Sequence, residues 1–420
     1  MAIIPNAKKI ELCDGIRVLK EEIPSVRSVA FGIMVGAGSG TETDKEAGIS
    51  HYIEHMTFKG TPKRTAFEIA HALDSVGGKI NAYTSKEVTL YYAVVLDKHV
   101  GVAVDVICDM FLDSLYDPKE METEKGVVLE EIKMYEDTPD ELIHDLFAEQ
   151  ILHGHSLGKP TIGFAENIKA VKREDIVNYR KRLYSPKNVI ISIAGAIPAG
   201  IEDKFTPYFS DFHGESVNLT QLQPTIKGSL KLKHKKTEQT HMCLGAKGPS
   251  QQSEDRYAFA IMDNILGGSM SSRLFQEVRE KRGLVYAIYA TASPFRDFGI
   301  SYVYAGTSKE NLKQVIDLTL EQYTKIKKEG LTPKEIEKAK EYMKGTMVLG
   351  LESTSARMSW MAKSEFYYNK IVTVDEEFAK IDKVTQDDIV RVANEYIKNE
   401  YLTLTVIGDI DELPVKEIKC

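Results

Sequence analysis

Residues 171–197 read VKREDIVNYRKRLYSPKNVIISIAGAI, and residues 384–410 read VTQDDIVRVANEYIKNEYLTLTVIGDI. The two stretches align without a gap, so that Val171 falls on Val384 and Gly195 falls on Gly408. The two stretches lie 213 positions apart in the chain. A period this long indicates a duplicated domain, because solenoid repeats have periods of about 20 to 50 residues. We therefore predict two similar halves joined by a polar linker that contains Pro224: residues 1–212, the linker 213–228, and residues 229–420.

The first half mixes strand-like and helix-like segments. Gly77-Gly78 precedes two strand-like runs, residues 80–85 and 88–95. Helices are expected over three further segments: from near Thr65, over about 99–115, and from Thr138 to near Gly154. This mixture predicts an α+β fold in each half, with an antiparallel sheet and helices on one side of it.

The composition fits a folded two-domain protein. A chain of 420 residues exceeds a single core and suits two domains of about 200 residues. The net charge of −8 argues against nucleic acid as a partner. Four cysteines show no paired spacing and are expected to be reduced thiols: Cys13, Cys108, Cys243 and Cys420. The N-terminus, residues 1–13, lacks the apolar segment of a signal peptide, so we expect a cytoplasmic protein with no membrane partner.

The first half contains the motif His51-Tyr52-Ile53-Glu54-His55. On a helix, two imidazoles four positions apart lie on one face, so their nitrogens can meet at one ion. A catalytic zinc takes three protein ligands and keeps a position for water, and a nearby carboxylate can accept the proton of that water. The order His-x-x-Glu-His is the inverted zincin pattern, which predicts Glu54 as the general base.

The alternative interpretation of this motif is a solvated helix face that carries two histidines. With 10 histidines in 420 residues, the pattern arises by chance about once in fifty such chains. Thr43 and Glu46 form a capping box, and Gly60-Thr61-Pro62 is a stop signal. These signals predict a helix over about 44–59, which would give both histidines one rigid support.

A third ligand is expected on another buried element. Asp117-Pro118 begins a second predicted helix, which contains Glu124, Glu130 and Glu131. Glu124 and Glu131 are seven residues apart and share a helix face. The companions expected on that face are mostly apolar: Val127, Val128 and Tyr135. Carboxylates on an apolar stripe are costly unless a cation meets them, although two surface glutamates remain the alternative.

Four segments resemble the pitrilysin/insulinase family of zinc peptidases: residues 51–61, 81–87, 128–132 and 272–286. The resemblance covers nearly the whole chain, and the branch it points to is the catalytic (beta) subunit of mitochondrial processing peptidase with its bacterial single-chain homologues. It implies two α/β-roll domains that face each other around a substrate chamber. It also implies that one Zn²⁺ per chain is held by three ligands, with Glu130 as the near rival of the last: His51, His55 and Glu131.

The resemblance assigns further roles. Glu124 matches an acidic residue that assists the ligands without contacting the metal. Arg279 and Tyr286 match an arginine and tyrosine pair that reaches bound substrate, and both groups are donors suited to a carbonyl oxygen. Without the resemblance, Arg279 would be read as a surface cation of a helix and Tyr286 as a core residue of a strand. Bacterial relatives of this size suggest a homodimer, while a heterodimer with a separate partner stays open.

The alignment of the two halves, extended to the motif, shows what the second half carries in its place. Asn264 falls on His51, Gly267 on Glu54, and Gly268 on His55. Lys344 falls on Glu131. The second half therefore lacks the ligands and is expected to complete the substrate site.

We accordingly expect a zinc endopeptidase acting on extended peptides, either presequence-like segments or short fragments. The substrate is expected to pair as an added strand with one run of residues: Ile80, Asn81, Ala82, Tyr83 and Thr84. The alternative is a noncatalytic scaffold or peptide-binding subunit of the same fold, since fold alone does not settle function.

Overall fold

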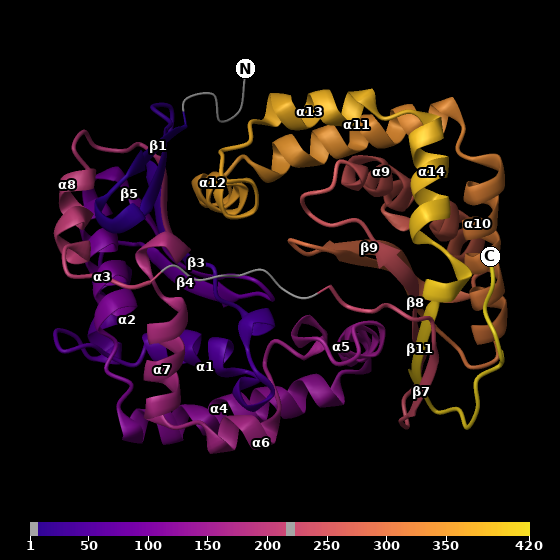
Figure 1. The fold of residues 1–420 in the computed structure, drawn as a ribbon, viewed down its shortest axis with the longest axis horizontal. Coiled ribbons are helices and arrows are strands. Elements are labelled where there is room, and N and C mark those ends of the chain that lie inside the picture. Colours follow the sequence, from indigo (N-terminus) through magenta and orange to yellow (C-terminus); the bar gives the residue numbers. More distant parts are fainter. Residues whose placement is uncertain (1–6, 216–222) are drawn as a thin grey trace. The chain divides into compact units, whose positions relative to one another are not determined.

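The computed structural model describes residues 7–215 and 223–420, so part of the linker expected at 213–228 lies outside the described residues. The described chain packs into two compact units (Figure 1). The first contains residues 7–133, 159–215 and 347–375, and the second contains residues 134–158, 223–346 and 376–420. Each unit is therefore assembled from separate stretches of sequence, whereas the sequence repeat alone predicts contiguous halves.

The first unit is built on a six-stranded sheet with the order β1-β2-β6-β3-β5-β4. Neighbouring strands are antiparallel except β2 and β6, which are parallel. The strands are Lys8–Glu11 (β1), Arg17–Glu22 (β2), Ser28–Val35 (β3), Lys79–Thr84 (β4), Thr89–Leu96 (β5) and Val189–Gly195 (β6). β4 is an edge strand, so one side of its backbone is not paired within this sheet.

Helices of the first unit cover both faces of this sheet. They are Ile49–Thr57 (α1), Ala66–Asp74 (α2), Val100–Asp113 (α3), Pro118–Asp137 (α4, which continues past the unit's boundary), Ala165–Ala170 (α6), Arg173–Leu183 (α7), Glu202–Phe205 (α8) and Thr354–Tyr368 (α12). On β3, Phe31 and Ile33 point into the core that contains Ile107 of α3. Gly32 points the other way, where an added Cβ would lie 2.8 Å from the sulfur of Met358 on α12.

The second unit repeats the sheet of the first. Its strand order is β7-β11-β8-β10-β9, with β7 and β11 parallel and the other neighbours antiparallel. Five strands of the first unit, β2-β6-β3-β5-β4, have the same order and the same directions. The strands are Leu230–His234 (β7), Thr240–Gly248 (β8), Val285–Pro294 (β9), Gly299–Thr307 (β10) and Thr403–Gly408 (β11).

The helices of the second unit follow the same plan. They are Pro139–Ile151 (α5), Asp255–Gly267 (α9), Leu312–Glu329 (α10), Pro333–Gly350 (α11, which ends past the boundary), Val374–Lys383 (α13, which begins before it) and Gln386–Tyr396 (α14). The expected α+β class is confirmed. The sequence repeat coincides with a helix and strand pair in each unit, because the first and last residues of α7 align with those of α14.

Two helices do not follow the contiguous halves. α5 comes from the first half of the sequence but packs with the second unit, where Ile143 and Phe147 share a core cluster with Cys243. α12 comes from the second half but packs with the first unit, where the Met358 carbonyl accepts a hydrogen bond from Ser192 on β6 at 2.8 Å. In the first unit, α3 and α12 therefore cover opposite faces of the sheet, whereas the sequence pattern predicts helices on one face only.

The start of the helix that carries the histidines differs from the prediction. Residues 44–46 form a short 3₁₀ turn after the Thr43–Glu46 capping box, and α1 itself begins at Ile49. Gly48 lies between them with φ of 95°, a conformation that favours glycine. A Cβ at this position would lie 2.5 Å from the Ile162 carbonyl oxygen, so a larger residue would also clash. The capping box was therefore assigned to the wrong helix.

Candidate metal centre

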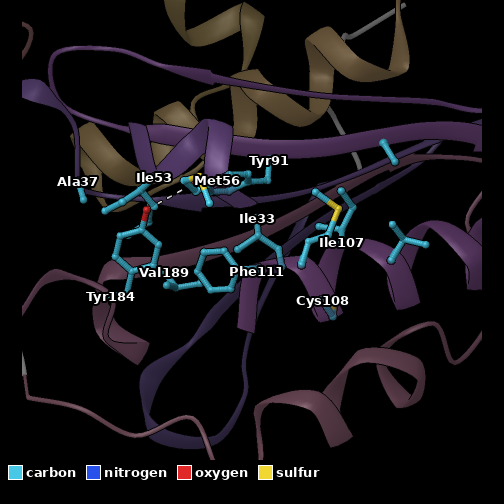
Figure 2. Close-up of a cluster of buried hydrophobic side chains, with 14 of the residues drawn as sticks. Ile33, Ala37, Ile53, Met56, Tyr91, Ile107, Cys108, Phe111, Tyr184 and Val189 are labelled. Atoms are coloured by element: carbon cyan, nitrogen blue, oxygen red, sulfur yellow. Dashed lines mark hydrogen bonds between the residues drawn. The ribbon is translucent and has the colours of Figure 1, made fainter. Parts of the chain in front are cut away.

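α1 is held against the core by its apolar face. Figure 2 shows Ile53 and Met56 of this helix in a buried cluster with Tyr91 and Phe111. Because Ile53 and Met56 point inward, the opposite face of the helix carries the three partly exposed side chains of the motif. These are His51, Glu54 and His55.

α4 supplies the second support. Asp117 caps its start, because its Oδ1 accepts hydrogen bonds from the Lys119 and Glu120 amides at 2.9 and 3.2 Å. The Tyr52 hydroxyl of α1 donates to the Met121 carbonyl of α4 at 2.6 Å, so the two helices are tied together.

The apolar stripe predicted on α4 is only partly correct. Val128 is fully buried, but Val127 is 49% exposed and Tyr135 is 37% exposed. The side chains that α4 buries are Met121, Glu124, Val128 and Ile132. The face is therefore narrower than the sequence suggests, although Glu124 lies within it.

The three candidate ligands lie close together. His51, His55 and Glu131 each offer a ligand atom, and these atoms all lie within 4.8 Å of one another. The Nε2 atoms of His51 and His55 lie 4.0 and 3.7 Å from the two oxygens of the Glu131 carboxylate. These separations are too long for hydrogen bonds. Ligands of a tetrahedral zinc ion lie roughly 3.3–3.6 Å apart, so small side-chain rotations would seat one ion between them.

Glu124 orients one of the imidazoles. Its Oε1 lies 2.8 Å from Nδ1 of His55, and its Oε2 lies 2.5 Å from the Lys59 ammonium. With Nδ1 engaged in this way, Nε2 of His55 is the nitrogen left to face Glu131. This geometry supports the role predicted for Glu124, which is to assist the ligands without contacting the metal. The contact of Lys59 with Glu124 was not predicted, because the sequence shows only that Lys59 lies one turn after His55.

The surroundings of His51 and His55 shift the pKa values of the two imidazoles in opposite directions. Burial, followed by the charge of His55, lowers the pKa of His51 to about 4. Burial also acts to lower the pKa of His55, but the hydrogen bond and charge of Glu124, together with the charges of Glu131 and Glu54, outweigh it and the net pKa is raised. A histidine must lose its proton to bind a metal. His51 is therefore ready as a ligand at neutral pH, while at His55 a metal ion competes with a proton up to a higher pH than at an ordinary histidine.

Glu54 lies beside the three candidate ligands and does not join them. The Thr84 hydroxyl at the end of β4 donates to its Oε2 at 2.5 Å, which fixes the carboxylate. Burial raises the pKa of Glu54, and the hydrogen bond from Thr84 opposes that rise. A carboxylate with a raised pKa is a stronger base than an exposed one, as general base catalysis requires.

The start of α1 depends on a residue that the sequence did not single out. The buried Glu42 carboxylate accepts hydrogen bonds from the amides of Gly48 and Ser50 at 2.7 and 2.8 Å. Burial raises the pKa of Glu42 to about 7, against these hydrogen bonds. The partners lie six and eight positions along the chain, which is outside every local capping pattern. No sequence signal identified this cap.

Arg279 and Tyr286 belong to the second unit. Arg279 lies in a π-helical segment, Phe275–Glu280, and its guanidinium lies 4.6 Å from the ring centre of Phe275 and 5.7 Å from that of Tyr286. Tyr286 is on β9 and is 76% exposed, so its alternative reading as a core residue is wrong. The run from Ile80 to Thr84 lies on edge strand β4.

The donor set fits zinc. Two imidazoles and a carboxylate are its common ligands in catalytic sites. Within residues 7–215 and 223–420, this is the one group of three or more histidine, cysteine or acidic side chains that is arranged to hold an ion. Cys108 and Cys243 are buried free thiols, and neither belongs to this group. No helix in the same ranges is long and apolar enough to cross a membrane.

We predict that Glu124→Gln weakens zinc binding by about 10–100-fold, because outer partners of metal-bound histidines have effects of that size. The amide keeps the shape but loses the charge that faces His55 and Lys59. Competition with a chromophoric chelator measures the affinity. Glu122→Gln is the matched control, since Glu122 is exposed on the same helix and pairs with Lys125. Equal zinc affinity in wild type and Glu124→Gln would contradict the prediction.

The chain matches two family models. Residues 17–164 match the model described as "Insulinase (Peptidase family M16)", and residues 170–343 match "Peptidase M16 inactive domain". The second model covers most of the half that lacks the ligands.

Relatives of similar length carry zinc protease names. The chain is 40% identical to "Uncharacterized zinc protease YmxG" of Bacillus subtilis (strain 168), over 97% of this chain and 99% of that protein. It is 38% identical to "Uncharacterized zinc protease SCO5738" of Streptomyces coelicolor, over 97% and 91%.

Two solved structures share the fold. One is titled as a peptidase M16 inactive domain from Pseudomonas fluorescens, with a TM-score of 0.90, 19% identity, and 99% and 100% of the two chains covered. The other is a protease from Helicobacter pylori, with a TM-score of 0.87, 22% identity, and 96% and 99% covered.

Proposed function

Because this chain belongs to the insulinase family of peptidases, peptidase family M16, we propose that it is a zinc-dependent endopeptidase that hydrolyses extended, unstructured peptides. The observation that carries the proposal is the convergence of His51, His55 and Glu131, with Glu54 beside them. A bound Zn²⁺, one per chain, would polarise the scissile carbonyl and make water more acidic.

Glu54 is the general base in this proposal. Its carboxylate takes a proton from the attacking water and hands it to the leaving amine. The hydrogen bond from Thr84 holds one carboxylate oxygen, which leaves the other oxygen free for the transfer. Glu131 carries the negative charge of the ligand set, and Glu124 keeps Nε2 of His55 turned toward the ion.

We propose that the substrate peptide binds along edge strand β4. A peptide paired with Ile80 to Thr84 would hydrogen-bond through its backbone, so extension matters more than sequence. Thr84 ends this strand and also binds Glu54, so an added strand would approach the base. Tyr286 and Arg279 are proposed to steady the carbonyl end of the substrate, since both side chains carry hydrogen-bond donors, Tyr286 is exposed and Arg279 is half-buried beside it. A homodimer in the cytoplasm remains part of this proposal.

Metal removal tests the proposal. We expect a strong chelator to abolish cleavage of short unstructured peptides, because the proposed reaction needs the bound Zn²⁺. A stoichiometric amount of Zn²⁺ should restore the cleavage, because the three protein ligands can bind the ion again. Cleavage is followed by mass spectrometry, with a folded protein of similar composition as a substrate that should resist. A protein that binds no zinc and ignores the chelator would favour a noncatalytic peptide-binding subunit.

A further inference from the structure

The second unit contains a cavity of about 370 Å³. Three elements line it: α9, β9 and α11. Its wall includes Asp263 and Asn264 on α9, Ala290 and Ala292 on β9, and Tyr342 on α11. A volume of this size can hold a small ligand or one long side chain.

The cavity stands where the first unit has its metal centre. α9, β9 and α11 take the places of α1, β4 and α4 in the repeated plan, and Asn264 corresponds to His51 in the alignment of the two halves. Lys344, which corresponds to Glu131, is turned to Glu341 and Asp382 at 2.5 and 3.0 Å. The duplicate has therefore lost its ligands.

Asp263 is the unusual group in this cavity. Asp263 is only 7% exposed. Both oxygens of its carboxylate lie 3.2 Å from the hydroxyl of Ser301 on β10. A carboxylate can accept about four hydrogen bonds, so one hydroxyl leaves most of its capacity unused. Burial raises the pKa of Asp263 to about 7, and the hydrogen bond from Ser301 opposes the rise. A buried carboxylate is costly unless a cation pairs with it.

Among the described residues that line the cavity, the one cation is already engaged. Arg256 lies on α9 and its guanidinium binds the buried Glu377 carboxylate at 2.9 Å. That pair is neutral as a whole, so Asp263 is left as the uncompensated acidic group of the wall. Apolar side chains make up much of the remaining surface, including Phe259 and Met343.

We propose that this cavity binds an organic cation, the ammonium of a lysine side chain or the guanidinium of an arginine side chain, on the Asp263 carboxylate. The apolar part of the wall packs against the methylene stem, and Tyr342 adds an aromatic ring to that wall. A basic side chain brings both the positive charge that pairs with a buried carboxylate and a methylene stem that suits apolar surroundings. The site is separate from the proposed peptidase chemistry and does not depend on it.

Calorimetry on the full chain, with its metal removed by a chelator, tests this site apart from the metal centre. The probes are Nα-acetyl-lysine amide, Nα-acetyl-arginine amide and the uncharged Nα-acetyl-norleucine amide. We expect one or both basic probes to bind at millimolar concentration or below, and the norleucine probe to bind at least tenfold more weakly. The stronger basic probe identifies the preferred cation. Equal binding of all three, or no binding of either basic probe, overturns the proposal.

Variants locate the binding. Asp263→Asn keeps the size of the side chain and should weaken the basic probe at least tenfold, while Asp317→Asn, an exposed site on α10, should not change it. If circular dichroism shows that Asp263→Asn does not fold, Ala292→Phe fills the cavity from its exposed rim and decides the question. Unchanged binding in a folded Asp263→Asn, or in Ala292→Phe, contradicts the assignment.

Discussion

Replacing Glu54 with glutamine is expected to lower kcat by about 10²–10⁴-fold while zinc stays bound, because general base catalysis contributes on that scale. The amide has the size of the carboxylate and can still accept a hydrogen bond from Thr84. It cannot accept a proton. Peptide turnover and zinc content, measured on the same preparation, separate the loss of the base from the loss of the metal.

The pH profile adds a control for this variant. In the wild type the base must be a carboxylate, and burial raises the pKa of Glu54, so activity should fall as the pH drops through that raised value. The residual activity of Glu54→Gln should lack this dependence. A variant with full zinc content and near-normal turnover would remove Glu54 from the role of base.

Replacing Glu131 with alanine is expected to cost both metal and activity. Glu131 is the one negatively charged member of the candidate ligand set, and its two oxygens face Nε2 of His51 and of His55. Loss of a direct ligand should weaken zinc binding more than the roughly 10–100-fold expected for an outer partner. Zinc per chain after dialysis, with peptide turnover, measures the effect.

Glu130→Ala is the matched control for Glu131→Ala. Glu130 is the neighbouring residue, but its side chain is 73% exposed and pairs with Lys133 on the helix surface. Zinc content and turnover should remain at the wild-type level. If Glu130→Ala loses zinc and Glu131→Ala keeps it, the assignment of the third ligand must be exchanged.

Features that depend on local sequence could be predicted. The Asp117 cap places the start of α4, and the spacing of His51 and His55 puts both on one face of α1. The repeat aligns α7 and β6 with α14 and β11. Caps, helical periodicity and aligned repeats involve neighbours in the chain, so the sequence carries them directly.

Features that depend on distant partners could not be predicted. Glu42 caps α1 from well before the helix begins, and Lys59 reaches Glu124 on another helix. The exchange of α5 and α12 between the units depends on which sheet face each helix covers, as the contact of Met358 with Gly32 illustrates. None of these partners is specified by periodicity or capping rules, since tertiary packing selects them.

X-ray absorption at the zinc edge of the loaded protein identifies the atoms that bind the ion. We predict one zinc per chain with nitrogen and oxygen neighbours at about 2.0–2.2 Å and outer scattering from two imidazole rings. A sulfur neighbour at about 2.3 Å, or a spectrum without imidazole scattering, would contradict the claim that His51, His55 and Glu131 hold the metal.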